Sequence, residues 1–234
     1  MLTHLHRFES NAELTAQLAQ QIAKDLTKAI DQRGTATLAV SGGSTPKPLF
    51  ERLSQLAIEW ALVTVTQVDE RWVDEAHQDS NARLIREQLL QNVAAAANFV
   101  SMKTAEDSPF DAEVNASETL AAFANGIDVV VLGMGEDGHT ASFFPGATTL
   151  TRALDTASSA LCVAVTPPQA PHQRMTLSLA ALLRARNSYL HITGESKLRV
   201  LHNADAPGSE EELPIRSLLR RSQPPIQIYY ANRN

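Results

Sequence analysis

A single histidine lies in a glycine-rich segment that directly follows an apolar stretch. Residues 128–140 read DVVVLGMGEDGHT, in which four apolar residues lead into three glycines and then His139. Such an apolar run is typical of a parallel strand that is covered on both faces of its sheet. The glycines allow positive φ angles and a close approach of the backbone to a ligand. Because a histidine titrates near neutral pH, His139 is a candidate for exchanging a proton with a bound molecule.

A second segment, SGGST at residues 41–45, has the composition of a phosphate-binding loop. Its glycines expose backbone N–H groups, its hydroxyls add donors, and Pro46 and Pro48 predict a helix whose N-terminus follows. The spacing G-x-x-x-x-G-K-[ST] is absent, which disfavours ATP or GTP. The segment therefore indicates either a small phosphorylated ligand or simply a tight turn between a strand and a helix.

Sequence motifs for a dinucleotide cofactor, a covalent nucleophile or a metal ion are incomplete or absent. Gly133, Gly135 and Gly138 match the G-x-G-x-x-G pattern of dinucleotide-binding loops, but Pro145-Gly146 interrupts the helix that must follow. The sequence contains neither G-x-S-x-G nor H-E-x-x-H. The histidines other than His139, His191 among them, are therefore expected at the surface or in packing. We therefore expect no cofactor, no metal ion and no covalent nucleophile.

Composition narrows the class of protein further. With 234 residues, 44% of them hydrophobic, the chain can form one α/β domain over residues 1–234. The net charge of −6 argues against a nucleic-acid surface. No apolar run approaches the roughly 20 residues that span a bilayer. The lone Cys162 lies in an apolar run and is expected in the core. These features predict a cytoplasmic protein without membrane or nucleic-acid partners.

Strands and helices are expected to alternate along the chain. Strands are predicted at residues 37–40, 62–68, 127–132, 161–165, 189–193 and 226–230. Helices are predicted from Asn11, as the capping residue, to near Gly34, after Thr45, from Ser80 through Leu90, from Ser108 and Pro109, and over residues 195–202. This alternation predicts a doubly wound, mostly parallel, Rossmann-like sheet with helices on both faces.

Four segments, in order along the chain, resemble the 6-phosphogluconolactonase family: LAVSGGSTP at 38–46, VDERWV at 68–73 with DSN at 79–81, LGMGEDGHTASFFPG at 132–146 and RMTL at 174–177. The wider superfamily includes glucosamine-6-phosphate deaminase, which shares the Asp-Gly-His core and a Gly-Ser-Thr-Pro loop. Arg71 and Trp72, together with the segment 140–145, are more similar to the lactonases. Phe143 and the pair Asp74-Glu75 depart from the usual pattern, which affects only local loop shape.

The resemblance implies hydrolysis of 6-phospho-D-glucono-1,5-lactone to 6-phosphogluconate, the second step of the oxidative pentose phosphate pathway. In this chemistry we expect His139 to take a proton from the attacking water, with Asp69 or Asp137 orienting the imidazole. The phosphate is expected to bind Gly42, Gly43, Ser44, Thr45, Arg71, Arg174 and Lys197.

Two alternatives remain open at this point. The chain could be a glucosamine-6-phosphate deaminase or isomerase, in which Asp69 would move a proton between carbons and His139 would open the ring. It could also be a phosphosugar-binding module without catalysis, although such sensors usually carry a further domain. The sequence is compatible with a monomer or a small homo-oligomer.

Overall fold

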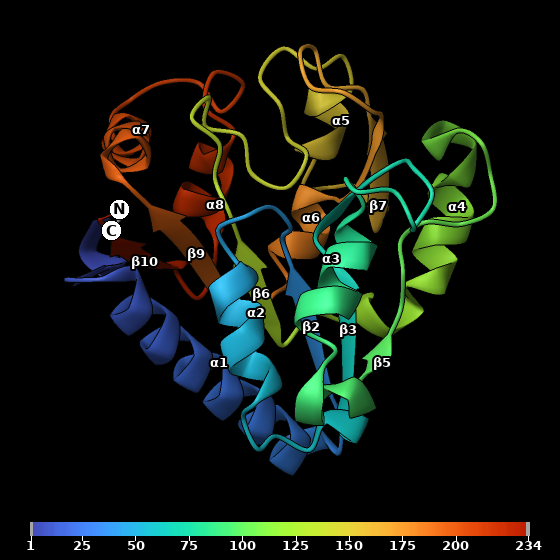
Figure 1. Ribbon diagram of the computed structural model, residues 1–234. Coiled ribbons are helices and arrows are strands. Elements are labelled where there is room, and N and C mark those ends of the chain that lie inside the picture. Colours follow the sequence, from blue (N-terminus) through green and yellow to red (C-terminus); the bar gives the residue numbers. More distant parts are fainter. Residues whose placement is uncertain (1, 233–234) are drawn as a thin grey trace.

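A parallel sheet of seven strands forms the centre of the protein in the computed structural model, which describes residues 2–232 (Figure 1). The strands pair in the order β1-β10-β9-β6-β2-β3-β5. They are β1 (Leu5–Phe8), β2 (Ala36–Val40), β3 (Val63–Gln67), β5 (Asn98–Phe99), β6 (Val129–Leu132), β9 (Asn187–Thr193) and β10 (Gln227–Ala231). From β2 the chain adds β3 and β5 on one side, and from β6 it adds β9 and β10 on the other. The strand order therefore reverses between β2 and β6, and ligands of open α/β sheets bind at the carboxyl ends of strands at such a point.

Helices cover both faces of this sheet, as the alternating pattern predicted (Figure 1). One face carries α1 (Asn11–Arg33), α2 (Lys47–Ser54) and α3 (Asn81–Gln88). The other face carries α4 (Pro109–Thr119), α5 (Leu150–Ala153), α6 (Leu179–Leu182), α7 (Glu195–Asp205) and α8 (Ile215–Arg221). None of the helices within residues 2–232 combines the length and the apolar character needed to cross a membrane.

The predicted helix ends are close to the observed ones, with two corrections. Ser10, and not Asn11, is the N-cap of α1, because its hydroxyl accepts the N–H of Glu13 at 3.1 Å. Gly34 ends α1 in the left-handed conformation, as expected. Ser80 caps α3 as predicted, but this helix ends at Gln88.

A smaller antiparallel sheet was not predicted. It contains β4 (Asp69–Arg71), β8 (Arg174–Leu177) and β7 (Cys162–Val165), in that order. The predicted strand 62–68 therefore ends early, and 161–165 belongs to this sheet instead of the parallel one. Val68 marks the change, since its N–H donates to Val40 of the large sheet while its carbonyl accepts from Leu177, each at 2.9 Å.

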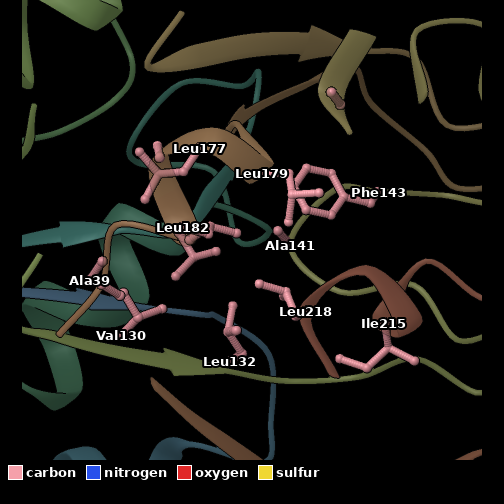
Figure 2. Packing of buried hydrophobic residues seen from close by; sticks show 14 of the residues in the cluster. Ala39, Val130, Leu132, Ala141, Phe143, Leu177, Leu179, Leu182, Ile215 and Leu218 are labelled. Atoms are coloured by element: carbon pink, nitrogen blue, oxygen red, sulfur yellow. The ribbon is translucent and has the colours of Figure 1, made fainter. Parts of the chain in front are cut away.

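Two apolar clusters pack against the two faces of the parallel sheet. Figure 2 shows part of the cluster on the α8 side, in which Ala141 and Phe143 pack with Leu132 of β6 and Ile215 and Leu218 of α8. The loop after β6 is thus anchored in the core. Cys162 is also buried in this cluster, as predicted, and burial raises the pKa of its thiol to about 12.

Candidate active site

Two adjoining cavities lie where β2 and β6 end. The first, of about 270 Å³, is bordered by the loop 41–46 after β2, the loop 133–135 after β6, and His139, His191 and Lys197. The second, of about 330 Å³, shares Asp69, Arg71, His139 and Ala141 with the first and adds Arg174 and His172. The candidate site therefore occupies the switch point of the sheet, where open α/β folds bind ligands.

The loop 41–46 forms one wall of the first cavity. Gly43 has φ +95°, a conformation that glycine adopts without strain. Gly42 is needed for space, because a Cβ there would overlap the amide of Asn81, which is held by a 2.8 Å hydrogen bond to the carbonyl of Asp69. The Ser41 hydroxyl is buried without a hydrogen-bond partner among the described residues. The loop therefore offers hydrogen-bond donors to a ligand without crowding it.

His139 and Asp137 form a hydrogen-bonded pair at the opposite wall. Nδ1 of His139 lies 2.6 Å from Oδ1 of Asp137, and the backbone N–H of His139 donates to the same oxygen at 3.1 Å. Burial raises the pKa of Asp137, but the hydrogen bonds and charge of His139 outweigh it, so the net pKa is lower than usual. With Nδ1 directed to a carboxylate, Nε2 is the nitrogen that remains to accept a proton from a ligand.

The glycines around this pair have different structural roles. Gly138 has φ +77°, as the sequence predicted for this loop, whereas Gly135 is required for space. A Cβ at Gly135 would lie under 3.0 Å from both the ring of His139 and the carboxylate of Asp137. The N–H of Gly135 also donates to the carbonyl of His139 at 2.8 Å. The loop therefore closes tightly around the imidazole.

Asp69 is buried on the small sheet and does not pair with His139. Its Oδ2 accepts the hydroxyl of Ser142 at 2.6 Å, and the backbone N–H of Ser142 lies 3.3 Å from Oγ1 of Thr176, opposite Asp69 in the sheet. Asp69 therefore attaches the loop that carries His139 to the small sheet. Of the two carboxylates that the sequence left open, Asp137 is the one in contact with the imidazole.

Arg71 and Arg174 face each other directly across β4 and β8. Like charges directly opposite each other destabilise a sheet, and negative charge nearby offsets their repulsion. Arg174 is 5% exposed, and its Nη1 has no hydrogen-bond partner among the described residues. Burial, opposed by Asp69 and assisted by Arg71, lowers the pKa of Arg174. Arg71 donates to the carbonyl of Asp79 at 2.6 Å and borders both cavities.

Lys197 lies in the first turn of α7, as predicted, and borders the first cavity. Its Nζ donates to the carbonyl of Met134 in the loop after β6. The three cations predicted to bind phosphate therefore lie at different cavities. Lys197 borders the first cavity with the loop 41–46, Arg174 borders the second, and Arg71 borders both.

Glu70 was not singled out by the sequence. It is 1% exposed and accepts the backbone N–H groups of Arg71, Asn81 and Ala82 at 2.7–2.8 Å. Burial raises the pKa of Glu70 although these hydrogen bonds act in the other direction. Glu70 thereby joins β4 to the N-terminus of α3 and sets the positions of Arg71 and Asn81. Only its place beside Asp69 after a strand could have drawn attention to it.

His191 is a second residue that sequence reasoning missed, since it was assigned to packing or to the surface. It borders the first cavity, is 3% exposed and lies on β9.

One group of side chains among residues 2–232 could hold a metal ion: the potential ligand atoms of His77, Asp79 and His172 lie within 4.8 Å of one another. In this structure Nε2 of His172 is 3.0 Å from Oδ2 of Asp79, the distance of a hydrogen bond. This contact lowers the pKa of Asp79 and links the loop before α3 to the loop before β8. Asp79 and His172 of this group border the second cavity, and the group does not include His139.

The structure brings the sequence-predicted residues together. Gly42, Gly43, Ser44, Thr45, Asp69, Arg71, His139 and Lys197 border the first cavity, Arg174 borders the second, and Asp137 contacts His139 from behind. No helix follows the glycines at 133–138 before residue 150, which agrees with the interruption seen in the dinucleotide pattern.

Comparison with known proteins gives consistent matches over nearly the whole chain. The family model described as glucosamine-6-phosphate isomerases/6-phosphogluconolactonase matches residues 9–226. A 6-phosphogluconolactonase of Rhizobium meliloti is 45% identical and covers 99% of this chain and 100% of its own. One of Mesorhizobium japonicum is 43% identical over 96% of this chain and 93% of its own. The crystal structure of a 6-phosphogluconolactonase from Shewanella baltica has a TM-score of 0.95 and 44% identity, covering 98% of this chain and 97% of that one.

Proposed function

Because the chain belongs to the glucosamine-6-phosphate isomerase/6-phosphogluconolactonase family, we propose that it hydrolyses 6-phospho-D-glucono-1,5-lactone to 6-phosphogluconate. The observation that carries this proposal is the arrangement of the first cavity. An imidazole–carboxylate pair stands at one wall and a glycine loop with donor groups at the other. A phosphorylated lactone needs both, since one end must be held and the other must react with water.

In this proposal the phosphate lies against the loop 41–45. Backbone N–H groups of Gly42, Gly43 and Ser44 and the hydroxyls of Ser44 and Thr45 donate to it. Arg71 and Lys197 supply positive charge from the small sheet and from α7. Binding energy from this end fixes the ring so that its carbonyl carbon faces His139.

The proton transfers follow from the His139–Asp137 pair. Nε2 of neutral His139 takes a proton from water as the water oxygen bonds to the lactone carbonyl carbon, giving a tetrahedral oxyanion. The bond from that carbon to the ring oxygen then breaks, and the imidazolium returns the proton to the ring oxygen. Asp137 holds the imidazole of His139 in the required tautomer and stabilises the charged imidazolium. The products are a free hydroxyl and a carboxyl group, so atoms and charge balance.

Arg174 contributes from the second cavity, beside His139. Its unpaired Nη1 is available to an anion at this end of the site, whether substrate phosphate or the developing oxyanion. The two roles differ kinetically, because a ground-state contact acts on KM and an oxyanion contact acts on kcat.

The test uses freshly generated lactone and follows acid release, with the spontaneous rate subtracted. We expect acceleration by the wild-type protein and a loss of about 10²- to 10⁴-fold in kcat for His139→Ala. His202→Ala is the matched control, because this histidine is exposed on α7. Glucosamine 6-phosphate is assayed in parallel. Turnover of the amino sugar without acceleration of the lactone would place the protein in the deaminase branch, and near-wild-type kcat in His139→Ala would refute the assigned base.

A further inference from the structure

His191 has an unusual environment for a histidine of the sheet interior. Its side chain is 3% exposed, and neither Nδ1 nor Nε2 has a hydrogen-bond partner among the described residues. A buried polar group without a partner destabilises the folded state, and both ring nitrogens of this imidazole are such groups. A residue needed only for packing at this position would be better replaced by an apolar one. The unpaired nitrogens therefore point to a partner that residues 2–232 do not supply.

The alternation of side chains along β9 and its register against β6 direct this imidazole into the first cavity. On β9, Tyr189 packs on the α1 side of the sheet, whereas Leu190 and Ile192 pack on the α8 side. Since side chains alternate along a strand, His191 projects to the α1 side, toward the loop that precedes α2. Leu132 of β6 pairs with Leu190, so continuing the register by one residue brings Gly133 beside His191.

Gly133 leaves this part of the cavity open. A Cβ at position 133 would meet no other atom within 4 Å, and both residues border the first cavity. The space in front of the imidazole is therefore available to a ligand. Lys197 and the loop 41–46 border the same cavity, which places His191 near the bound phosphosugar of the proposed function.

The chemistry of the ring selects the kind of group that it can bind. Burial lowers the pKa of His191 to about 4, so the ring is neutral near neutral pH and carries one N–H donor and one acceptor nitrogen. A sugar hydroxyl also donates one proton and accepts another, and thus matches the ring. A phosphate dianion only accepts, so it would leave the second nitrogen without a partner.

We propose that His191 is a specificity-determining residue of the site, where its ring exchanges hydrogen bonds with a hydroxyl group of the bound phosphosugar. This inference rests on the proposed function for the identity of the ligand class. It adds to the site a residue that belongs neither to the loop 41–46, nor to the cations, nor to the His139–Asp137 pair.

The test compares His191→Leu, His191→Asn and the control His202→Leu by calorimetric binding of 6-phosphogluconate and of inorganic phosphate. We expect His191→Leu to weaken 6-phosphogluconate binding about 10-fold, the effect of losing hydrogen bonds to an uncharged group, and to leave phosphate binding unchanged. Asn, which retains a donor and an acceptor, should recover part of the loss. The KM of the lactone should rise in parallel with the dissociation constant.

The outcomes separate this inference from the proposed function. Unchanged 6-phosphogluconate binding in His191→Leu overturns the role of His191, even if the wild-type protein hydrolyses the lactone. An equal loss for inorganic phosphate also overturns it, because the contact would then be to phosphate. Selective loss of sugar binding supports His191 even if the wild-type protein fails to accelerate the lactone, in which case only the proposed reaction is refuted. Thermal unfolding checks the fold, and His191→Leu should be at least as stable as the wild type because it removes unpaired buried polar atoms.

Discussion

Gly135→Ala should inactivate the enzyme without unfolding it. The added Cβ would lie under 3.0 Å from His139 and Asp137, whereas ordinary contacts begin near 3.4 Å. The pair must therefore withdraw by roughly 1 Å, enough to break a 2.6 Å hydrogen bond and to move Nε2 away from the attacking water. Displacements of about 1 Å in a catalytic group cost roughly 10²-fold in rate.

The cost to folding is expected to be small. The side chains of His139 and Asp137 are 33% and 51% exposed, so both can move toward solvent instead of compressing the core. The φ of Gly135 is not positive, so alanine introduces no backbone strain there. We expect a change in the free energy of unfolding within about 1 kcal/mol.

The assay is steady-state hydrolysis of the lactone by Gly135→Ala, His139→Ala and the double variant, with urea unfolding of each. We expect kcat to fall about 10²-fold in Gly135→Ala, with KM little changed because the phosphate loop is untouched. In the His139→Ala background the second substitution should have no further effect, since the group it displaces is already gone. Wild-type kcat in Gly135→Ala would refute the steric argument. A further loss in the double variant would show that alanine acts through something other than His139.

Two further predictions follow from buried charges. Arg174→Gln should raise KM about 10-fold or more if the guanidinium holds phosphate, or lower kcat about 10²-fold or more if it stabilises the oxyanion. In either case Arg174→Gln should unfold at no lower urea concentration than wild type, because Arg174 carries an unpaired buried nitrogen. Unchanged kcat and KM would show that Arg174 does not belong to the site. Asp128 is 4% exposed at the amino end of β6, where it accepts the N–H of Thr37 at 2.8 Å and pairs with Arg33 and Arg186. Asp128→Asn should lower the free energy of unfolding by about 2 kcal/mol, measured in urea, with kcat unchanged, since the cavities lie at the other end of the sheet; a loss of activity in the folded variant would contradict this separation.

Five of the seven strands of the parallel sheet were predictable, because they are short apolar runs with turn signals at both ends. The edge strands β1 (LHRF) and β5 (NF) contain no such run and were not predicted. Val129–Leu132 is buried at every position and was found from its composition alone. The small sheet was not predictable, because β4 has three residues, two of them acidic, and its stability comes from pairing with Arg174–Leu177, about 100 positions later in the chain. Local patterns carry no information about such a pairing.

In the candidate site, too, some features follow from the sequence and others depend on contacts between distant residues. Loops that follow strands of one parallel sheet meet at its carboxyl edge, so the proximity of residues 41–45 to His139 follows from topology alone. The choice between Asp69 and Asp137 required side-chain geometry, because both lie near the same edge. The environment of His191 required the alternation of side chains along β9, which decides the face on which the imidazole lies, and the register of β9 against β6, which brings Gly133 beside it. The sequence attributed the need for glycine in the loop 133–138 to positive φ and to a close approach of a ligand, whereas at Gly135 a side chain would instead overlap His139 and Asp137 of the same loop.

Unpaired buried polar atoms connect these observations. Ser41 Oγ, Arg174 Nη1 and both ring nitrogens of His191 lack hydrogen-bond partners among the described residues, and the three residues border the two cavities. Each such atom costs on the order of 1–3 kcal/mol in the free protein. A bound phosphosugar can supply oxygen partners to every one of them. Hydrogen bonds that these atoms do not make in the free protein can therefore form with the ligand. Apolar substitution at these positions should therefore stabilise the free protein while weakening its ligand binding. Substitution of a residue that serves only the fold should not combine higher stability with weaker binding.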